Sequence, residues 1–163
     1  MGRIRKAVFD AGPLIHLNEI KALRILGIVR LKIVTVEVKG EIKGIQIPSA
    51  RVVYLDGKGK EISNILIEQF QLDLGEATSI AFCKMENIRN FFTDDLEARD
   101  VAKEQGLEAH GTLALVFRAY REGLLTGKQA LILIDLLYNE SSLYLTKDLV
   151  EYAKIEIMGY SHR

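Results

Sequence analysis

Residues 4–13 of the chain read IRKAVFDAGP, an apolar run that is followed at once by an acidic residue and the start of a helical pattern. Ile4–Phe9 is predicted to be a strand, and Pro13 lies near the start of the next helix, where a residue without a backbone N–H is tolerated. Short apolar runs of this kind alternate with segments of helical period along the rest of the chain. Such alternation is typical of β/α units, and it predicts an α/β fold with a mainly parallel sheet.

The composition is typical of one soluble domain spanning residues 1–163. Hydrophobic residues make up 48% of the chain, which is sufficient for a packed core. The 22 Lys and Arg residues are matched by 22 Asp and Glu residues, which excludes a polybasic nucleic-acid binder. Cys83 is the single cysteine, which excludes a disulfide framework and fits a reducing compartment. No apolar run approaches the roughly 20 residues of a membrane span, so we expect a cytoplasmic protein.

The other elements follow from the same periodicities. Apolar runs rich in β-branched residues predict strands, and Asp or Thr before a helical stripe predicts an N-cap. The glycine-rich segment Gly57–Lys60 is predicted to be a loop. The other predicted strands are Leu31–Thr35, Arg51–Leu55, Asn90–Thr93 and Leu107–Ala109. The predicted helices lie within Val36–Lys43, along the apolar stripe from Ile62 to Phe70, over Leu74–Glu86 with Asp73 as N-cap, over Leu96–Gln105, from Thr112 to Tyr120, over Ala130–Leu137 after a capping box at Thr126–Gln129, and after Thr146.

Acidic residues recur where predicted strands end or the following helices begin. Asp10 closes the first strand, and Asp94 and Asp95 follow the strand that begins at Asn90. Glu41 and Glu76 lie in helices. Because the carboxyl ends of parallel strands meet at one edge of a sheet, we expect these carboxylates to lie close together. Taken alone, each acid is also explained as a cap, a turn residue or a solvated helix residue, so the hypothesis depends on the set.

Carboxylates gathered at one edge would repel one another unless a cation neutralised them. Ligation by oxygen alone favours Mg²⁺ or Mn²⁺ over zinc, which prefers His or Cys. One or two such ions activate water and stabilise the leaving oxygen of a phosphodiester. The sequence therefore predicts a hydrolytic metal site that needs no covalent nucleophile.

Several other side chains are weaker candidates for roles near these acids. Thr93 and Thr112 carry hydroxyls near the same strand ends, where they either orient a ligand or cap a helix. His16 lies on an apolar stripe and is predicted to be packed or partly exposed rather than a metal ligand. Cations that flank the acids are candidate RNA phosphate contacts, although surface solvation explains each of them equally well. These cations are Lys39, Lys43, Arg99 and Lys103.

Five stretches, in order along residues 5–123, resemble the PIN domain family, and especially a prokaryotic branch with D-x-x-P-L, G-E-A and D-D-x-x-A-R motifs. They are VFDAGPL (8–14), VKGEI (38–42), LGEA (74–77), TDD with AR (93–95 and 98–99) and GT (111–112). The resemblance implies a three-layer α/β/α Rossmann-like sandwich with a mainly parallel central sheet. It also implies a Mg²⁺- or Mn²⁺-dependent ribonuclease whose acidic positions are Asp10, Glu41, Glu76 and Asp95. Asp94, directly beside Asp95, is an alternative metal ligand.

In the implied mechanism, Asp10, Glu76 and Asp95 hold the metal, and activated water cleaves the RNA. Glu41 binds a second ion or directs the water. Such proteins are often the toxin half of a toxin–antitoxin pair, so RNA and an antitoxin protein are the implied partners. The apolar helix at residues 130–138 is either deeply buried or pairs with another chain, and together with the resemblance it predicts a homodimer. The alternative hypothesis is a non-catalytic PIN-like module that binds RNA or protein.

Overall fold

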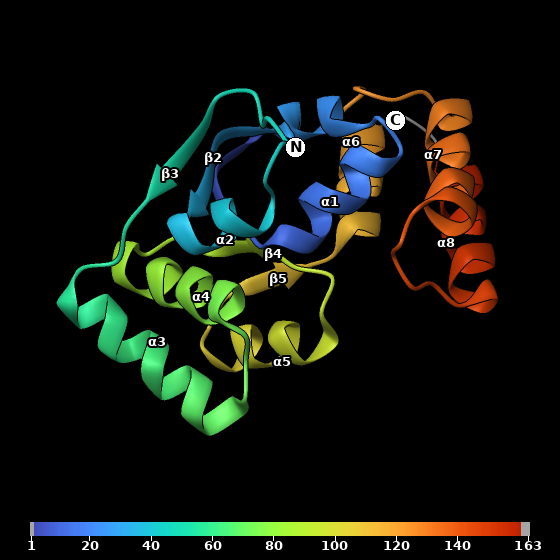
Figure 1. The fold of residues 1–163 in the computed structure, drawn as a ribbon. Coiled ribbons are helices and arrows are strands. Elements are labelled where there is room, and N and C mark those ends of the chain that lie inside the picture. The colour runs from blue at the N-terminus through green and yellow to red at the C-terminus, as the bar shows by residue number, and fades with distance from the viewer. Residues whose placement is uncertain (1, 161–163) are drawn as a thin grey trace.

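The computed structural model describes residues 2–160 and contains a five-stranded sheet in which all neighbouring strands are parallel. The strand order is β3-β2-β1-β4-β5, and helices cover both faces of the sheet (Figure 1). The three-layer α/β/α arrangement expected from the sequence is therefore confirmed. The strands are β1 (Ile4–Phe9), β2 (Val29–Thr35), β3 (Ala50–Val53), β4 (Asn90–Phe92) and β5 (Glu108–His110).

Two hydrophobic clusters form the core, one on each face of the sheet. The larger cluster contains Phe9 and Phe92, whose rings stack with centroids 5.1 Å apart. The smaller cluster contains Val8 and Phe91. Adjacent strand residues thus face opposite layers, which explains why the strands are apolar on both faces.

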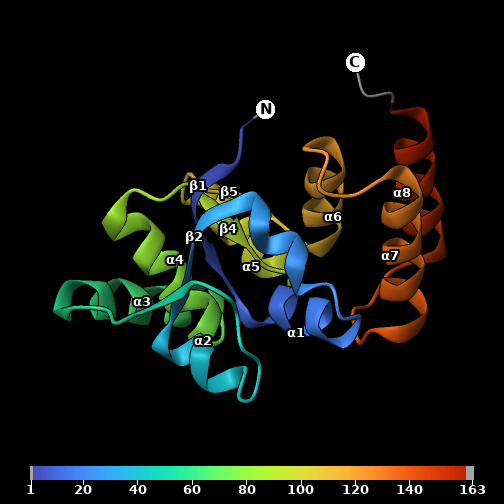
Figure 2. The same ribbon diagram turned by 90° about the horizontal axis from the view of Figure 1, so that it is seen from above.

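The helices divide between these two layers. Figure 2 shows α3 and α4 on one side of the sheet and α6, α7 and α8 on the other. The 3₁₀ helix η1 packs in the layer that contains α1 and α6, and α5 packs in the layer that contains α3 and α4. The helices are α1 (Ala11–Glu19), η1 (Leu23–Ile28), α2 (Val36–Glu41), α3 (Gly57–Phe70), α4 (Leu74–Glu86), α5 (Leu96–Glu104), α6 (Thr112–Arg121), α7 (Gly127–Glu140) and α8 (Lys147–Gly159).

Two local features differ from the expectations. Gly57–Lys60 forms the first turn of α3 instead of a loop. The carboxylate of Asp56 accepts a hydrogen bond from the Gly59 N–H at 2.7 Å, and this cap compensates for the poor helix propensity of glycine. The 3₁₀ helix η1, which lies between α1 and β2, was not predicted from the sequence.

Helix α7 is buried on one face only. The predicted capping box is present, because Thr126 and Gln129 each bond to the backbone N–H of the other. Leu133 and Ile134 are buried, whereas Ile132 is 48% exposed. Among the described residues, no helix combines the length and apolarity needed to cross a bilayer.

The parallel pairing brings the ends of β1 and β4 together at the carboxyl edge of the sheet. Phe9 is in register with Phe92, and the Asp10 N–H donates to the Phe92 carbonyl oxygen at 2.9 Å. Asp10 therefore lies next to Thr93 and the two aspartates that follow it. The end of β2 leads directly into α2, whose last residue is Glu41.

Candidate functional site

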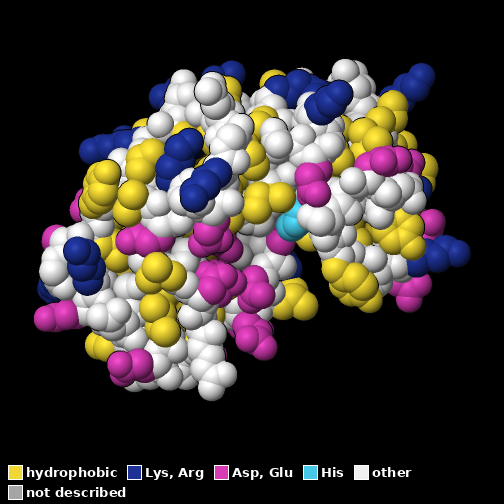
Figure 3. All heavy atoms as spheres, in the orientation of Figure 1, with side chains coloured by type: hydrophobic (Ala, Val, Ile, Leu, Met, Phe, Trp, Pro, Cys, Tyr) yellow, Lys and Arg dark blue, Asp and Glu magenta, His cyan; other side chains and the backbone are white. Residues whose placement is uncertain are grey.

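Seven acidic residues line one open pocket of about 900 Å³ at the carboxyl edge of the sheet. Figure 3 shows acidic side chains gathered around a hollow on this face, with a histidine at its edge. The pocket brings together every acid that the sequence singled out as a site candidate, and it adds one further aspartate and one further glutamate. The seven are Asp10, Glu41, Asp73, Glu76, Asp94, Asp95 and Glu97.

Asp10 lies deep in the pocket and is only 6% exposed. Burial raises the pKa of its carboxyl group to about 6, against the opposing effects of hydrogen bonds from the Thr93 hydroxyl and the Ala11 N–H. The charges of Asp73 and Asp95 raise it further. The Thr93 hydroxyl donates to Asp10 Oδ2 at 2.8 Å and holds that oxygen in place.

Glu76 is the second buried acid, and it is held at the start of α4 by a capping box. Its Oε2 accepts the Asp73 N–H at 3.0 Å, while Asp73 Oδ1 accepts the Glu76 N–H at 2.8 Å. Burial raises the pKa of Glu76 to about 7, and the charges of Asp73, Asp10 and Asp95 act in the same direction. The carboxylates therefore resist simultaneous ionisation.

Glu41 reaches the pocket from the end of α2 and passes directly over Gly75 of α4. A Cβ atom at residue 75 would overlap Glu41 Oε1 and crowd Val38. Gly75 therefore leaves the space through which the Glu41 carboxylate approaches the other acids. Burial, followed by the charges of Asp73 and Asp10, raises the pKa of Glu41.

Asp95 caps α5 at the rim of the pocket. Its Oδ1 accepts the Ala98 N–H at 2.8 Å, and its Oδ2 has no hydrogen-bond partner among the described residues. This is the expected position for an acid that follows a strand and begins a helix. One oxygen of Asp95 is left for a ligand.

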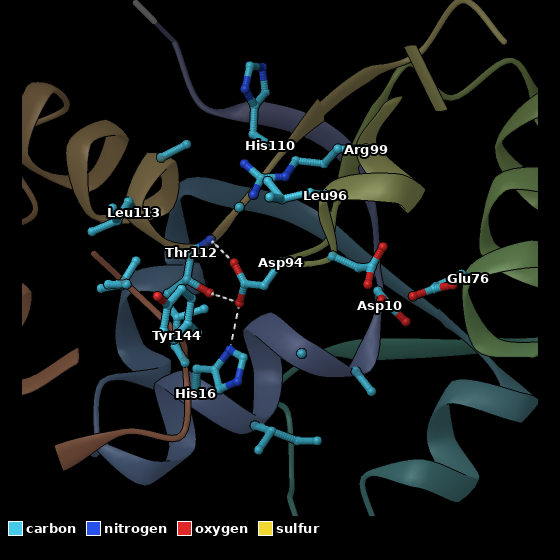
Figure 4. A pocket seen from close by; sticks show the side chains of 18 of the residues that line it. Asp10, His16, Glu76, Asp94, Leu96, Arg99, His110, Thr112, Leu113 and Tyr144 are labelled. Carbon is cyan, nitrogen blue, oxygen red and sulfur yellow. Dashed lines mark hydrogen bonds and ion pairs between the residues drawn. The ribbon is translucent and has the colours of Figure 1, made fainter. Parts of the chain in front are cut away.

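Asp94 is engaged on both oxygens. Its Oδ1 accepts the Thr112 N–H at 2.6 Å, and its Oδ2 accepts the Thr112 hydroxyl at 2.5 Å and contacts His16 Nδ1 at 2.6 Å (Figure 4). Burial alone would raise its pKa, but the hydrogen bonds from His16 and Thr112 outweigh burial and lower it. A Cβ at Gly111 would lie 2.7 Å from Asp94 Oδ1, so a glycine makes room for this carboxylate.

Of the four candidate phosphate contacts, only Arg99 lines the pocket. Its Nε atom is buried and has no hydrogen-bond partner among the described residues. Figure 4 shows its side chain at the rim, near Leu96 and His110. The remaining three cations are exposed and lie outside the pocket lining. They are Lys39, Lys43 and Lys103.

The acids share a pocket without forming a ready-made metal cage. Within residues 2–160, no three His, Cys, Asp or Glu side chains are placed closely enough to hold one ion. The capping roles of Glu76 and Asp95 give a physical reason, because each turns one oxygen toward its own helix.

Sequence reasoning assigned two of these residues smaller roles. Asp73 was predicted only as the cap of α4, although its charge acts on Asp10, Glu41 and Glu76. Its place one turn before Glu76 was the signal that was available. His16 is partly buried, as predicted, but nothing local in the sequence indicates its contact with Asp94.

The chain matches a known protein family over most of its length. A family model described as a PIN domain matches residues 6–157. No curated protein and no solved structure is significantly similar to the chain. PIN domains are in general nucleases that use divalent metals, which agrees with a pocket of carboxylates at the edge of a parallel sheet. The match, the fold and this pocket together establish that the chain belongs to the PIN domain family.

Proposed function

We propose that the protein is an endoribonuclease that cleaves RNA phosphodiester bonds with water activated by Mg²⁺ or Mn²⁺. One observation carries the proposal: Asp10, Glu41, Glu76 and Asp95 come from four separate elements and line one pocket. Burial and mutual repulsion raise the pKa of the first three. Such a cluster of acids destabilises the fold unless a cation binds it. Clusters with raised pKa values of this kind are typical of functional sites.

The donor set suits a hard divalent cation. Glu76 Oε2 and Asp95 Oδ1 are held by backbone N–H groups, while Glu76 Oε1 and Asp95 Oδ2 have no partner among the described residues. Mg²⁺ keeps several waters and is usually held by one or two carboxylates, so a tight group of three acids is not required. When bound, such an ion polarises a phosphoryl oxygen and lowers the pKa of water.

We assign the ion to the part of the pocket formed by Asp10, Glu76 and Asp95, which would hold it directly or through its bound waters. Glu41 directs the attacking water or binds a second ion. Asp94 is left out of this set because both of its oxygens already accept hydrogen bonds. Thr93 serves as the hydroxyl that orients Asp10.

Arg99 is the cation best placed to contact an RNA phosphate, because it lines the pocket and its buried Nε lacks a partner within the described part of the chain. Lys39, Lys43 and Lys103 extend the contact outside the pocket. The zero net charge of the chain predicts modest affinity that falls as salt increases.

The proposal is tested by incubating the purified chain with Mn²⁺ and labelled single-stranded or structured RNA. Cleavage is expected, and Asp10→Asn should abolish it without unfolding the protein. The matched control is Asp100→Asn, which removes an exposed carboxylate of α5 that does not line the pocket. Cleavage that survives Asp10→Asn would indicate a contaminating nuclease or another mechanism.

A second candidate function is a non-catalytic module that binds RNA or protein. It is favoured by the finding that no three acids of residues 2–160 lie at ligand distance. Calorimetric titration with Mn²⁺ distinguishes the two. A nuclease should bind the ion and lose that binding in Asp10→Asn, whereas a module should show no binding that depends on the carboxylates.

We further propose a cytoplasmic homodimer that acts as the toxin of a toxin–antitoxin pair. Large apolar side chains exposed on α8 support self-association, and a monomer in light scattering would remove that support. Arrest of growth on expression, relieved by a small neighbouring partner with a DNA-binding motif, would support the toxin role. The exposed residues are Leu149, Tyr152, Ile155 and Met158.

A further inference from the structure

We propose that His16, held by Asp94, gives a proton to the departing ribose oxygen when the RNA strand is cut. This inference rests on the proposed nuclease function. It begins from the 2.6 Å contact between His16 Nδ1 and Asp94 Oδ2, which joins α1 to the segment after β4. The pair belongs to the pocket that contains the acids, yet neither residue is needed there to hold the ion.

Asp94 holds the imidazole in a fixed position. Its side chain is 9% exposed, and the backbone N–H and hydroxyl of Thr112 fix its two oxygens. The glycine at position 111 leaves the space that this arrangement needs. A carboxylate that binds Nδ1 sets both the orientation of the ring and the position of its proton.

The other imidazole nitrogen is available to a substrate. His16 lines the pocket and its side chain is 14% exposed, and Nε2 has no hydrogen-bond partner in residues 2–160. Figure 4 shows the His16–Asp94 pair between Asp10 and Glu76 on one side and Tyr144 on the other. A strand whose phosphate lies on the acids and whose next nucleotide extends toward Tyr144 therefore passes His16.

The proton transfer completes the hydrolysis. The water oxygen forms a bond to phosphorus and releases one proton to solvent, while the bond from phosphorus to the ribose oxygen breaks. The ribose oxygen keeps the bonding electron pair and takes the proton from Nε2 of the His16 imidazolium. The neutral imidazole then regains a proton from solvent, so atoms and charge balance.

Three other donors in the pocket, Arg99, Thr112 and His110, are less suited to this step. Arg99 does not release a proton at neutral pH. The Thr112 hydroxyl is directed to Asp94. His110 is exposed, and no carboxylate within the described residues orients its ring.

The contact between His16 and Asp94 has an alternative role, which is only to hold α1 against the segment after β4. The structural role needs Nδ1 of His16, whereas the proton transfer needs Nε2, so substitutions that replace one nitrogen at a time distinguish the two roles. His16→Asn places an amide near the position of Nδ1, so it keeps a bond to Asp94 but has nothing at Nε2. His16→Gln places an amide near the position of Nε2, where it donates a hydrogen bond without transferring a proton.

The experiment compares two substrates with the full chain and Mn²⁺. One is an RNA oligonucleotide, whose ribose oxygen needs a proton to depart, and the other is a nucleotide p-nitrophenyl ester, whose leaving group needs none. Both His16 variants should lower kcat on RNA by about 10²-fold or more. On the ester, kcat should stay within about threefold of wild type. His110→Gln is the matched control and should behave as wild type on both substrates.

Equal losses on the two substrates would overturn the inference, because a merely structural tie affects both alike. Unchanged RNA cleavage in both variants would also overturn it. If His16→Asn fails to fold, as judged by thermal unfolding, the two substrates are compared with His16→Gln alone. If the wild-type chain cuts neither substrate, the nuclease proposal itself fails and this inference falls with it.

Discussion

Asp10→Asn should make the metal-free protein more stable near neutral pH, although it removes the proposed activity. Asp10 is 6% exposed, and burial raises its pKa from 3.8 to about 6. An acid with a higher pKa in the folded protein than in the unfolded chain binds protons more readily when folded. Its contribution to stability is therefore fully present below about pH 4 and is lost as the pH rises through about 6.

The size of this effect follows from the two pKa values. At about 1.36 kcal/mol for each pH unit, a pKa that rises from 3.8 to about 6 costs about 3 kcal/mol of unfolding free energy near pH 7. Asparagine is uncharged, and its amide oxygen still accepts the Thr93 hydroxyl. Its amide has one oxygen where the carboxylate has two to accept the Thr93 hydroxyl and the Ala11 N–H, and a weakened hydrogen bond costs about 1 kcal/mol. The expected net gain is therefore about 2 kcal/mol near pH 7.

Urea unfolding in the presence of a chelator measures this difference. Asp10→Asn should be more stable than wild type near pH 7, and the advantage should disappear near pH 4. Mn²⁺ at 100 times its Kd should restore about 2.7 kcal/mol to the wild type and little to the variant. If Asp10→Asn is the less stable protein near pH 7 with chelator present, the assignment of Asp10 as a destabilising buried carboxylate is wrong.

Two further substitutions test the packing around the acids. Gly75→Ala should leave the unfolding free energy within about 1 kcal/mol of wild type, because alanine favours a helix. The added methyl group displaces the Glu41 carboxylate by roughly 1 Å, so kcat on RNA should fall by about 10²-fold. Adding Glu41→Gln to Gly75→Ala should lower kcat little further. If the losses of the two substitutions add in the double variant, Gly75 acts independently of Glu41. Asp73→Ala removes the N-cap of α4 and should lower the free energy of unfolding, measured in urea, by about 1 kcal/mol. An unchanged urea midpoint would mean that the hydrogen bond from the Glu76 N–H to Asp73 contributes nothing to stability.

Much of the secondary structure could be predicted from the sequence because its causes are local. The helix that begins at Leu74 follows from the Asp73 cap, and the strand Ile4–Phe9 follows from an apolar run. The prediction of a loop at Gly57–Lys60 was wrong, because glycine propensity was given more weight than the cap supplied by Asp56.

The candidate site was predictable only in part. Acids at the ends of parallel strands must share an edge, so the meeting of Asp10 with the acids after β4 follows from topology. How each acid uses its oxygens does not follow from topology. Sequence reasoning left Asp94 and Asp95 as alternatives, and the structure shows one bound on both oxygens and the other with a free oxygen.

The sequence by itself determined the order of the elements and the positions of the acids, because hydrophobic period and helix capping act over a few residues. Only the tertiary structure decided that Glu41 passes over Gly75 and that His16 contacts Asp94 across 78 residues of chain. These contacts arise where separate helices pack around the ends of β1, β2 and β4. Side chains that meet in this way are brought together by packing, and no local pattern encodes their contact.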